Sequence, residues 1–266
     1  MNTLIYKLAR WFLHTIGRTS SGLSLCLAEG LTSGKTVDYV YRHQAQGRFL
    51  IGKLIDKQFL NHPGWEGVRQ RRRNAEDLIA EAILELRAQK KPIVLVDIAS
   101  GPAAYILSVL KKVGEHDVTA RCQDLEERWL QEGTYAAQTM DLKNVHFQQG
   151  DAFDAESLIK LHPQPNIFVA SGFYDWIFDD VLVQRSFSTL YQTLHQGGYF
   201  VVTNQVSHPN LKFVQHMFSD FNHQPLNMKM RSAELIQQWL KDAGFHVKKS
   251  VQDAKGYYSV TLAVKE

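Results

Sequence analysis

IVLVDIASGPA, residues 93–103, is the stretch that decides the fold. It opens with four consecutive apolar residues, most of them β-branched, a composition that favours a strand buried on both faces of a parallel sheet. Small residues follow, and a helical pattern from Ala103 to Lys112 then ends at Gly114, which can form a left-handed cap. This order predicts a strand, a tight turn and a helix, with a ligand site beyond the strand's carboxyl end.

The remainder of the chain after this stretch alternates between strand and helix patterns. Further strands are predicted at 118–122, 145–148, 166–170, 199–203, 245–249 and 257–264, and helices at 125–140, 179–195 and 232–243. Turn residues at 253–256 join the last two strands, so we expect these to be antiparallel neighbours. The predicted fold class is α/β, with a Rossmann-like, seven-stranded, mostly parallel sheet that ends in an antiparallel β-hairpin.

Residues 1–90 have a different pattern, which is helical with loop signals. We predict that they form an N-terminal helical cap or lid, and that residues 91–266 form the ligand-binding sheet domain. An amphipathic face at 78–86 comes just before the first strand.

Bulk composition narrows the function classes. A hydrophobic content of 44% and a charged content of 21% are typical of a globular protein. The net charge of +3 is too small to indicate a nucleic-acid partner, and we expect none. Two distant cysteines without a CxxC motif predict neither a metal site nor a disulfide framework. No apolar stretch is long enough to span a membrane, so we expect a cytoplasmic protein.

The first 18 residues form a basic amphipathic pattern. Lys7, Arg10 and Arg18 lie away from an apolar side made of Leu4, Ile5, Leu8, Trp11, Phe12 and Ile16. Such a helix can lie on the inner membrane surface, and this would suit a lipid substrate. Packing of the same side against the parent domain explains the pattern equally well.

The turn after the first strand is built from small residues. Ala99, Gly101 and Ala103, with Ser100 between the first two, let the backbone approach a ligand closely. The same letters also fit a dinucleotide fingerprint in which alanine replaces two glycines, because Ala99-x-Gly101-x-x-Ala104 has the spacing of GxGxxG. Spacing alone therefore leaves the cofactor class open.

Acidic residues that follow three successive strands help to decide between the possible cofactor classes. Asp97 would repel a pyrophosphate and attract the ammonium or sulfonium of S-adenosylmethionine. Asp124, followed by Leu125, is placed to accept hydrogen bonds from ribose hydroxyls. The carboxylate of Asp151 could accept a hydrogen bond from the adenine amine.

The two residues that follow Asp151 complete this predicted adenine site. A backbone N–H of Ala152 would donate to the adenine ring, and Phe153 lies beside it in the sequence. The three acids together favour S-adenosylmethionine.

These motifs, in this order, resemble the class I S-adenosylmethionine-dependent methyltransferases. Within that class the segments LTSGKTVDYVYR, DIASGPAAYIL, GDAFD, SGFYDW and GGYFVVTNQ are similar to a bacterial methyltransferase family whose members are sometimes fused to an α/β-hydrolase domain. The resemblance runs from about Leu31 to the C-terminus. The sequence departs from the commoner pattern at Ala99, Ala103 and Asn166, and alanine is acceptable in the turn where the backbone keeps a negative φ.

The methyl acceptor is harder to infer. Ser171-Gly172-Phe173-Tyr174 occupies the place where methylases of nucleobase amines carry (D/N/S)-P-P-(Y/F), but both prolines are missing. We therefore expect a small-molecule or lipid acceptor, with Ser171 and Gly172 near the cofactor. Tyr174 and His208 are the candidate bases, should the acceptor need to lose a proton.

The resemblance also implies a cofactor role for the segment around residue 40. Tyr39 and Tyr41 would lie over the cofactor, and Arg42 would bind its carboxylate. Another basic run consists of Arg69, Arg71, Arg72 and Arg73. It could meet the phosphates of a lipid headgroup or a nucleic acid, but we expect a solvated helix face. Two other functions stay open at this point: an NAD(P)-dependent oxidoreductase, and a non-catalytic module that keeps the fold in order to bind a partner.

Overall fold

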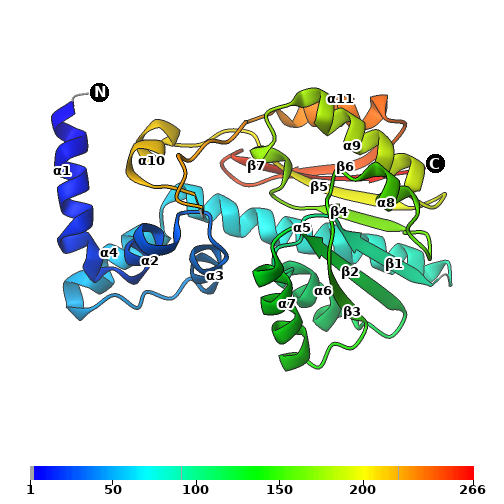
Figure 1. Cartoon of the computed structure of the whole chain (residues 1–266), viewed down its shortest axis with the longest axis horizontal. Helices are drawn as coiled ribbons and strands as arrows, with labels where there is room; N and C mark the ends of the chain where they lie inside the picture. The colour runs from blue at the N-terminus through cyan, green and yellow to red at the C-terminus, as the bar shows by residue number, and fades with distance from the viewer. Residues whose placement is uncertain (1–2, 91, 221) are drawn as a thin grey trace. The chain divides into compact units, whose positions relative to one another are not determined.

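The computed structural model describes residues 3–90, 92–220 and 222–266, and the chain divides into two compact units (Figure 1). The helical unit comprises residues 1–69 and 208–228, and the sheet unit comprises residues 70–207 and 229–266. Residues 1 and 2 of the predicted amphipathic segment, and residue 91 at the start of the predicted sheet domain, lie outside the described residues.

This division differs in two ways from the predicted boundary at residue 90. Helix α5 (Pro63–Ala88) contributes to both units, because its part from Gln70 onward packs against the sheet through Leu78, Ile79 and Ile83. Residues 208–228 also return to the helical unit after the fifth strand.

Within the described residues the sheet has seven strands, the predicted number, in the order β3-β2-β1-β4-β5-β7-β6. Its strands are β1 (Ile93–Asp97), β2 (Val118–Asp124), β3 (Val145–Gln149), β4 (Ile167–Ala170), β5 (Tyr199–Gln205), β6 (His246–Gln252) and β7 (Tyr258–Val264). The first five are parallel, and β7 pairs antiparallel with both β5 and β6. The predicted mostly parallel sheet with a closing hairpin is therefore confirmed.

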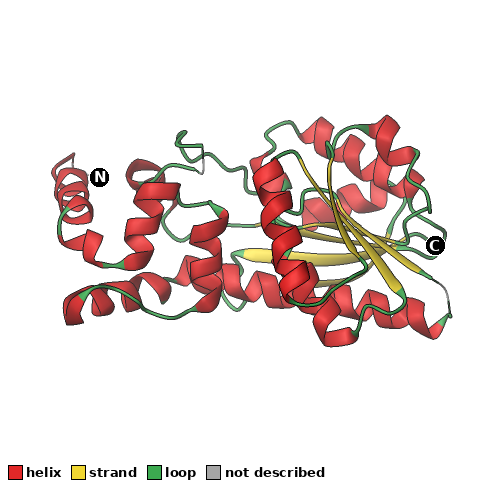
Figure 2. Ribbon diagram, turned by 60° about the horizontal axis from the view of Figure 1, so that its bottom comes forward, coloured by secondary structure: helices red, strands yellow, loops and turns green. Residues whose placement is uncertain are grey.

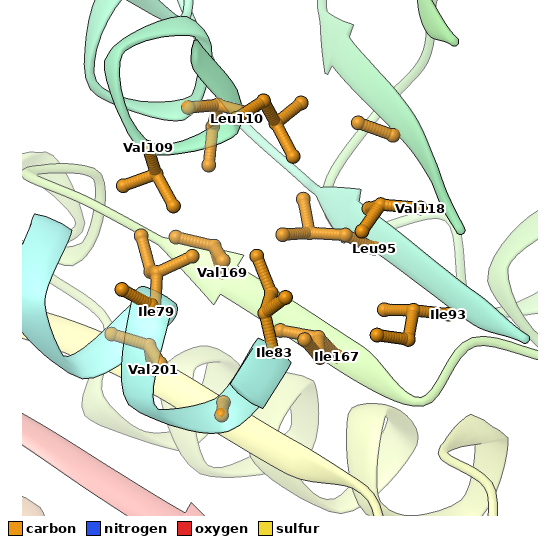
Figure 3. Close-up of a cluster of buried hydrophobic side chains, with 14 of the residues drawn as sticks. Ile79, Ile83, Ile93, Leu95, Val109, Leu110, Val118, Ile167, Val169 and Val201 are labelled. Carbon is orange, nitrogen blue, oxygen red and sulfur yellow. The ribbon is translucent and has the colours of Figure 1, made fainter. Parts of the chain in front are cut away.

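Helices cover both faces of this sheet, and Figure 2 shows the twisted strands between them. One face packs against α5, α6 (Ala104–Val113) and α7 (Glu127–Thr139), in the cluster that Figure 3 shows around Ile79, Ile83 and Leu95. The other face packs against α8 (Ala155–Ile159), α9 (Asp180–Thr193) and α11 (Ala233–Asp242). Strands β1, β4 and β5 are buried throughout, which explains the apolar runs at 93–96, 167–170 and 199–202.

Asn166, one of the departures from the commoner pattern, connects the two central strands. Its side-chain oxygen accepts a hydrogen bond from the Val94 N–H at 2.7 Å, and its amide nitrogen donates to the Pro92 carbonyl at 2.8 Å. An ionised aspartate has no donor, so asparagine alone of the two makes both bonds.

The helical unit has its own core. Its helices are α1 (Thr3–His14), η1 (Ile16–Thr19), α2 (Ser21–Glu29), α3 (Gly34–Arg42), α4 (Phe49–Leu60) and α10 (Leu211–Met217), together with the start of α5. A fully buried carboxylate, Asp56, accepts hydrogen bonds from Ser20, Gly22, Tyr39 and Gln46. Among the described residues, no helix has the length and apolar character that crossing a membrane requires.

Candidate functional site

The predicted cofactor residues of the sheet unit gather at one edge of the sheet. Strands β1 to β4 are parallel neighbours, so the segments that follow them leave the sheet on the same side. Asp97 and Asp124 end β1 and β2, and Asp151 and Ser171 come directly after β3 and β4. The structure therefore places these four positions along the carboxyl edge, where ligands of open α/β sheets bind.

The turn between β1 and α6 is held by backbone hydrogen bonds. The Ser100 N–H donates to the Gln123 carbonyl at 2.8 Å, and the Ala103 N–H donates to the Ser100 carbonyl at 3.0 Å. Gly101 has a φ of 53°, and a Cβ built on it would meet no atom within 4 Å. Its backbone thus faces open space, as a close approach to a ligand requires.

Ala103 corrects one sequence-based expectation. Alanine was expected to be acceptable in this turn where φ stays negative, but Ala103 adopts φ 52° and ψ 29°, the left-handed conformation. Its buried methyl group packs in the core between the sheet and α6, and this packing offsets the unfavourable backbone conformation.

Asp97 is fully buried at the end of β1. Burial raises the pKa of its carboxyl group to about 7 and nearby Asp124 adds to the shift, whereas the Tyr105 hydroxyl and the Ala99 N–H oppose it. Tyr105 donates a hydrogen bond to Oδ2, but Oδ1 is buried with no donor in hydrogen-bond geometry in the described part of the chain. A buried acceptor with spare capacity at a ligand-binding edge fits a cationic donor such as an ammonium group.

Asp124 orders the turn as well as facing its open side. Its Oδ2 accepts from the Gly101 N–H at 2.8 Å, and its Oδ1 accepts from the Glu126 N–H at 3.0 Å. Each carboxylate oxygen can accept a second hydrogen bond, so both stay able to bind ribose hydroxyls. Leu125, beside it, is 61% exposed.

The segment after β3 presents a carboxylate at the surface. Asp151 is exposed, and its Oδ1 accepts from the Phe153 N–H at 2.8 Å, while Ala152 is buried. The N-cap of α8 is Asp154, which accepts from the Ser157 N–H, so Asp151 is not needed to start that helix. Its free accepting capacity is compatible with the predicted adenine contact.

A glycine follows β4 at the same edge. Gly172 has a φ of 72°, and its N–H donates to Thr203 Oγ1 at 2.8 Å. A Cβ built on Gly172 would lie 3.2 Å from the Arg71 Nη1 atom, so the guanidinium of Arg71 lies beside this turn. The Arg71 guanidinium also lies over the Tyr258 ring, 5.0 Å from its centroid.

Arg71 lies beside the turn after β4, a placement that the sequence analysis missed because the run 69–73 was expected to be a solvated helix face. Helical periodicity could have indicated this placement. Arg71 precedes the buried residues Ala75, Leu78 and Ala82 by four, seven and eleven positions on α5, so it lies on the same face of the helix as they do. Its neighbours on the helix make local bonds instead, such as Arg72 to Glu76 and Arg73 to Gln70.

Tyr174 does not have the environment of a catalytic base. Its side chain is 1% exposed in the core below α9, and its hydroxyl is 2.8 Å from the Ser186 hydroxyl. Burial raises its pKa far above the usual value, so it holds its proton at neutral pH. In this structure Tyr174 packs and hydrogen-bonds in the core, and its predicted catalytic role stays a prediction.

Four predicted site residues belong to the helical unit. Tyr39 is buried there, and its hydroxyl donates to Asp56, while Arg42 is exposed and pairs with Asp38 at 2.5 Å. Tyr41 lies between them on α3 and is partly buried. Their predicted contacts with a cofactor stay predictions.

His208, the fourth of these residues, lies close to His62 in the helical unit. Its ring nitrogen Nδ1 accepts from the Asn210 N–H at 3.2 Å. Burial, with a smaller contribution from His62, lowers its pKa to about 4, so it is neutral at physiological pH. Its predicted catalytic role stays a prediction.

Comparison with solved structures identifies proteins that share this fold. A possible exported protein from Bordetella parapertussis matches with a TM-score of 0.71 at 16% identity, over 96% of this chain and 86% of that one. Magnesium protoporphyrin IX methyltransferase from Synechocystis PCC 6803, solved with bound S-adenosylhomocysteine, matches with a TM-score of 0.57 at 11% identity, over 90% and 98% of the two chains. At these identities the likeness concerns the fold alone, which is the α/β fold of S-adenosylmethionine-dependent methyltransferases.

Sequence comparison identifies closer relatives. The uncharacterized protein YnbC of Escherichia coli K12 is 34% identical over 265 residues, which is 98% of this chain and 45% of that protein. The chain thus spans less than half the length of this relative. A family model described as "Putative methyltransferase" matches residues 1–265. Because the match covers nearly the whole sequence, the chain belongs to this methyltransferase family.

Proposed function

We propose that the protein binds S-adenosylmethionine at the carboxyl edge of β1 to β4 and transfers its methyl group to a small-molecule or lipid acceptor. The observation that carries this proposal is the buried Asp97 carboxylate, with its unfilled Oδ1, behind the open backbone of Gly101. A carboxylate in this position favours a cationic ligand over the pyrophosphate of a dinucleotide. The oxidoreductase alternative is correspondingly disfavoured.

Each residue of the edge has a proposed task. Asp97 would accept a hydrogen bond from the ammonium group of the methionine moiety, Asp124 from the ribose, and Asp151 from the adenine amine. S-adenosylmethionine, when bound, supplies a methyl carbon that its sulfonium activates. The chain contributes binding, orientation and exclusion of water, and these are sufficient for a nucleophile that has no proton to lose.

A base is needed only for an acceptor such as a hydroxyl or a protonated amine. Of the two candidates, His208 is the more exposed, because Tyr174 is buried in the core. Its pKa of about 4 keeps it unprotonated at neutral pH, so it is ready to accept a proton but is only a weak base. We therefore propose that activity does not require a strong base.

Calorimetric titration of the full chain with S-adenosylhomocysteine and with NADH tests the proposal. We expect binding of the first and none of the second. Gly101→Val should lose at least about 1.4 kcal/mol of binding free energy, a tenfold effect, because its side chain would enter the open space before the turn. Gly197→Val is the matched control, since Gly197 also has a positive φ and open space but lies in the turn before β5. Tight binding of NADH alone would overturn the proposal.

Arg71 is our proposed ligand for the carboxylate of the methionine moiety. Its planar guanidinium is placed by α5 and Tyr258 beside Gly172, and arginine binds carboxylates through two parallel hydrogen bonds. Arg71→Met should weaken S-adenosylhomocysteine binding by roughly 2 kcal/mol, since charged hydrogen bonds are worth about 1.5–3 kcal/mol.

Methylthioadenosine, which lacks the amino-acid moiety, distinguishes this role from a general loss of structure. Its affinity should be equal for the wild type and for Arg71→Met. The parallel variant Arg42→Met tests the assignment that the family resemblance implies. Equal weakening of both ligands by Arg71→Met would contradict a carboxylate contact, and weakening of S-adenosylhomocysteine only by Arg42→Met would assign the contact to Arg42.

A further inference from the structure

Helix α1 exposes an apolar face that the core of the helical unit does not use. Leu4, Ile5, Leu8 and Trp11 are 61%, 50%, 58% and 61% exposed. The opposite side of the helix packs through Tyr6, Ala9 and Leu13 against residues of α4 and α10. The predicted apolar side, including Phe12 and Ile16 at 37% and 39% exposed, is thus not the side of the helix that packs on the protein.

The first turns of α4 expose a second apolar group. Phe49, Leu50, Ile51 and Leu54 are 80%, 83%, 55% and 65% exposed. Single exposed apolar side chains are ordinary, but eight large ones on two helices of one small unit are typical of an interaction surface.

A hydrogen bond and a close backbone contact fix the start of α4 against Thr19. The Arg48 N–H donates to the Thr19 carbonyl at 2.7 Å, and a Cβ built on Gly52 would lie 2.4 Å from that same oxygen. Phe49 adopts a φ of 56°, which is unfavourable for an aromatic residue. Thr19 is the last residue of η1, and only Thr15 separates η1 from α1. The contact therefore fastens the start of α4, with its exposed apolar group, to the segment that follows α1.

Charges around these groups have a single sign. No acidic residue occurs between positions 1 and 28, and Asp56 is the only one between 42 and 60. Asp56 is 0% exposed and engaged by four hydrogen-bond donors, so it presents no charge at the surface. The exposed cations of the two segments are Lys7, Arg10, Arg18, Arg48, Lys53 and Lys57, together with Arg42, whose charge Asp38 offsets at 2.5 Å.

We propose that α1 and the start of α4 form one docking face for an anionic lipid bilayer, with the apolar side chains in the acyl boundary and the cations at the headgroups. Cations that border exposed leucine, phenylalanine and tryptophan are the pattern of interfacial helices. A second copy of the chain is disfavoured, because the two like-charged faces would repel each other. The proposal does not depend on the identity of the methyl acceptor.

Sedimentation of the full chain with lipid vesicles tests this docking face. We expect binding to vesicles of phosphatidylcholine and phosphatidylglycerol in equal parts, and at least about tenfold weaker binding to phosphatidylcholine alone. The double variant Phe49→Ser/Leu50→Ser should lose about tenfold or more in partitioning. Lys53→Gln/Lys57→Gln should lose about thirtyfold on the anionic vesicles and little on the neutral ones.

Leu84→Ser is the matched control, because Leu84 is 52% exposed on α5 in the sheet unit. It should bind vesicles as the wild type does, and circular dichroism should show that all variants are folded. Absence of binding to anionic vesicles by the folded wild type would overturn the proposal. So would a concentration-dependent dimer that Phe49→Ser/Leu50→Ser abolishes in place of vesicle binding, because that result assigns the face to a protein contact.

Discussion

Replacing Asp97 with asparagine should weaken binding of S-adenosylhomocysteine by at least about thirtyfold, because removing one partner of a buried, hydrogen-bonded charge pair costs about 2–5 kcal/mol. Asparagine keeps the shape of the side chain and one acceptor oxygen, so the loss of affinity measures the contribution of the negative charge. The measurement is calorimetric titration at pH 8. Asp141→Asn, a change at an exposed carboxyl group, is the control and should bind normally.

The pH dependence of binding also tests the contact between Asp97 and the ligand. The carboxyl group of Asp97 has a pKa of about 7, above the roughly 3.9 of an unfolded aspartate. The native state therefore holds this proton as pH rises from about 4 to about 7, and the contribution of Asp97 to the stability of the free protein is lost over that window. A cationic ligand needs the ionised form, so its affinity should rise over the upper part of the same window.

With a pKa of 7, the ionised fraction of Asp97 falls about tenfold between pH 8 and pH 6. We expect the dissociation constant for S-adenosylhomocysteine to rise by the same factor. Asp97→Asn should remove this dependence. Tyr105→Phe removes the hydroxyl that lowers the pKa and should move the midpoint to higher pH. An unchanged affinity between pH 6 and pH 8 in the wild type would contradict the proposed contact.

The positions of the three acids could be predicted from sequence because each follows directly from a strand. Once β1, β2 and β3 are recognised as parallel neighbours, Asp97, Asp124 and Asp151 must lie along one edge, whatever the details of the helices. Helices α8 and α10 were not predicted, since five and seven residues are too few to establish a helical period.

Roles that depend on tertiary contacts could not be predicted in this way. Tyr174 comes directly after the β4 turn, yet the 3₁₀ turn at Tyr174–Trp176 directs its ring into the core, where it meets Phe187 edge to face. Arg71 lies 101 positions before Gly172 in the sequence, and only the packing of α5 on the sheet brings the two together. Sequence identifies which residues end a strand, whereas it does not fix where a side chain beyond that end points.

Arg231 holds the segment after β4 in this conformation. It is 4% exposed, its Nη1 donates to the Tyr174 carbonyl at 2.8 Å, and its Nη2 donates to the Ile177 carbonyl. Nε and Nη2 also donate to Asp180 Oδ1 at 2.9 and 2.8 Å. One side chain thus satisfies two carbonyls that precede α9 and the carboxylate of its first residue.

We expect Arg231→Met to lower the free energy of unfolding of the sheet unit by about 1–3 kcal/mol, the cost of leaving a buried acceptor such as the Tyr174 carbonyl without its donor. The ion pair itself adds little, because the Asp180 side chain is 38% exposed. Chemical denaturation followed by tryptophan fluorescence measures this. Lys229→Met is the matched control, since Lys229 pairs with the same carboxylate at 2.8 Å but its side chain is 33% exposed, and it should cost about 1 kcal/mol or less.

Arg231→Lys separates the geometry of the guanidinium from its charge. Lysine keeps the charge that Asp180 needs, but a single ammonium cannot reach in three directions as the planar fork of arginine does. We therefore expect this variant to regain less than half of the stability that Arg231→Met loses. Full recovery by lysine would show that the charge alone matters, and that the carbonyls of Tyr174 and Ile177 do not depend on Arg231 for their position.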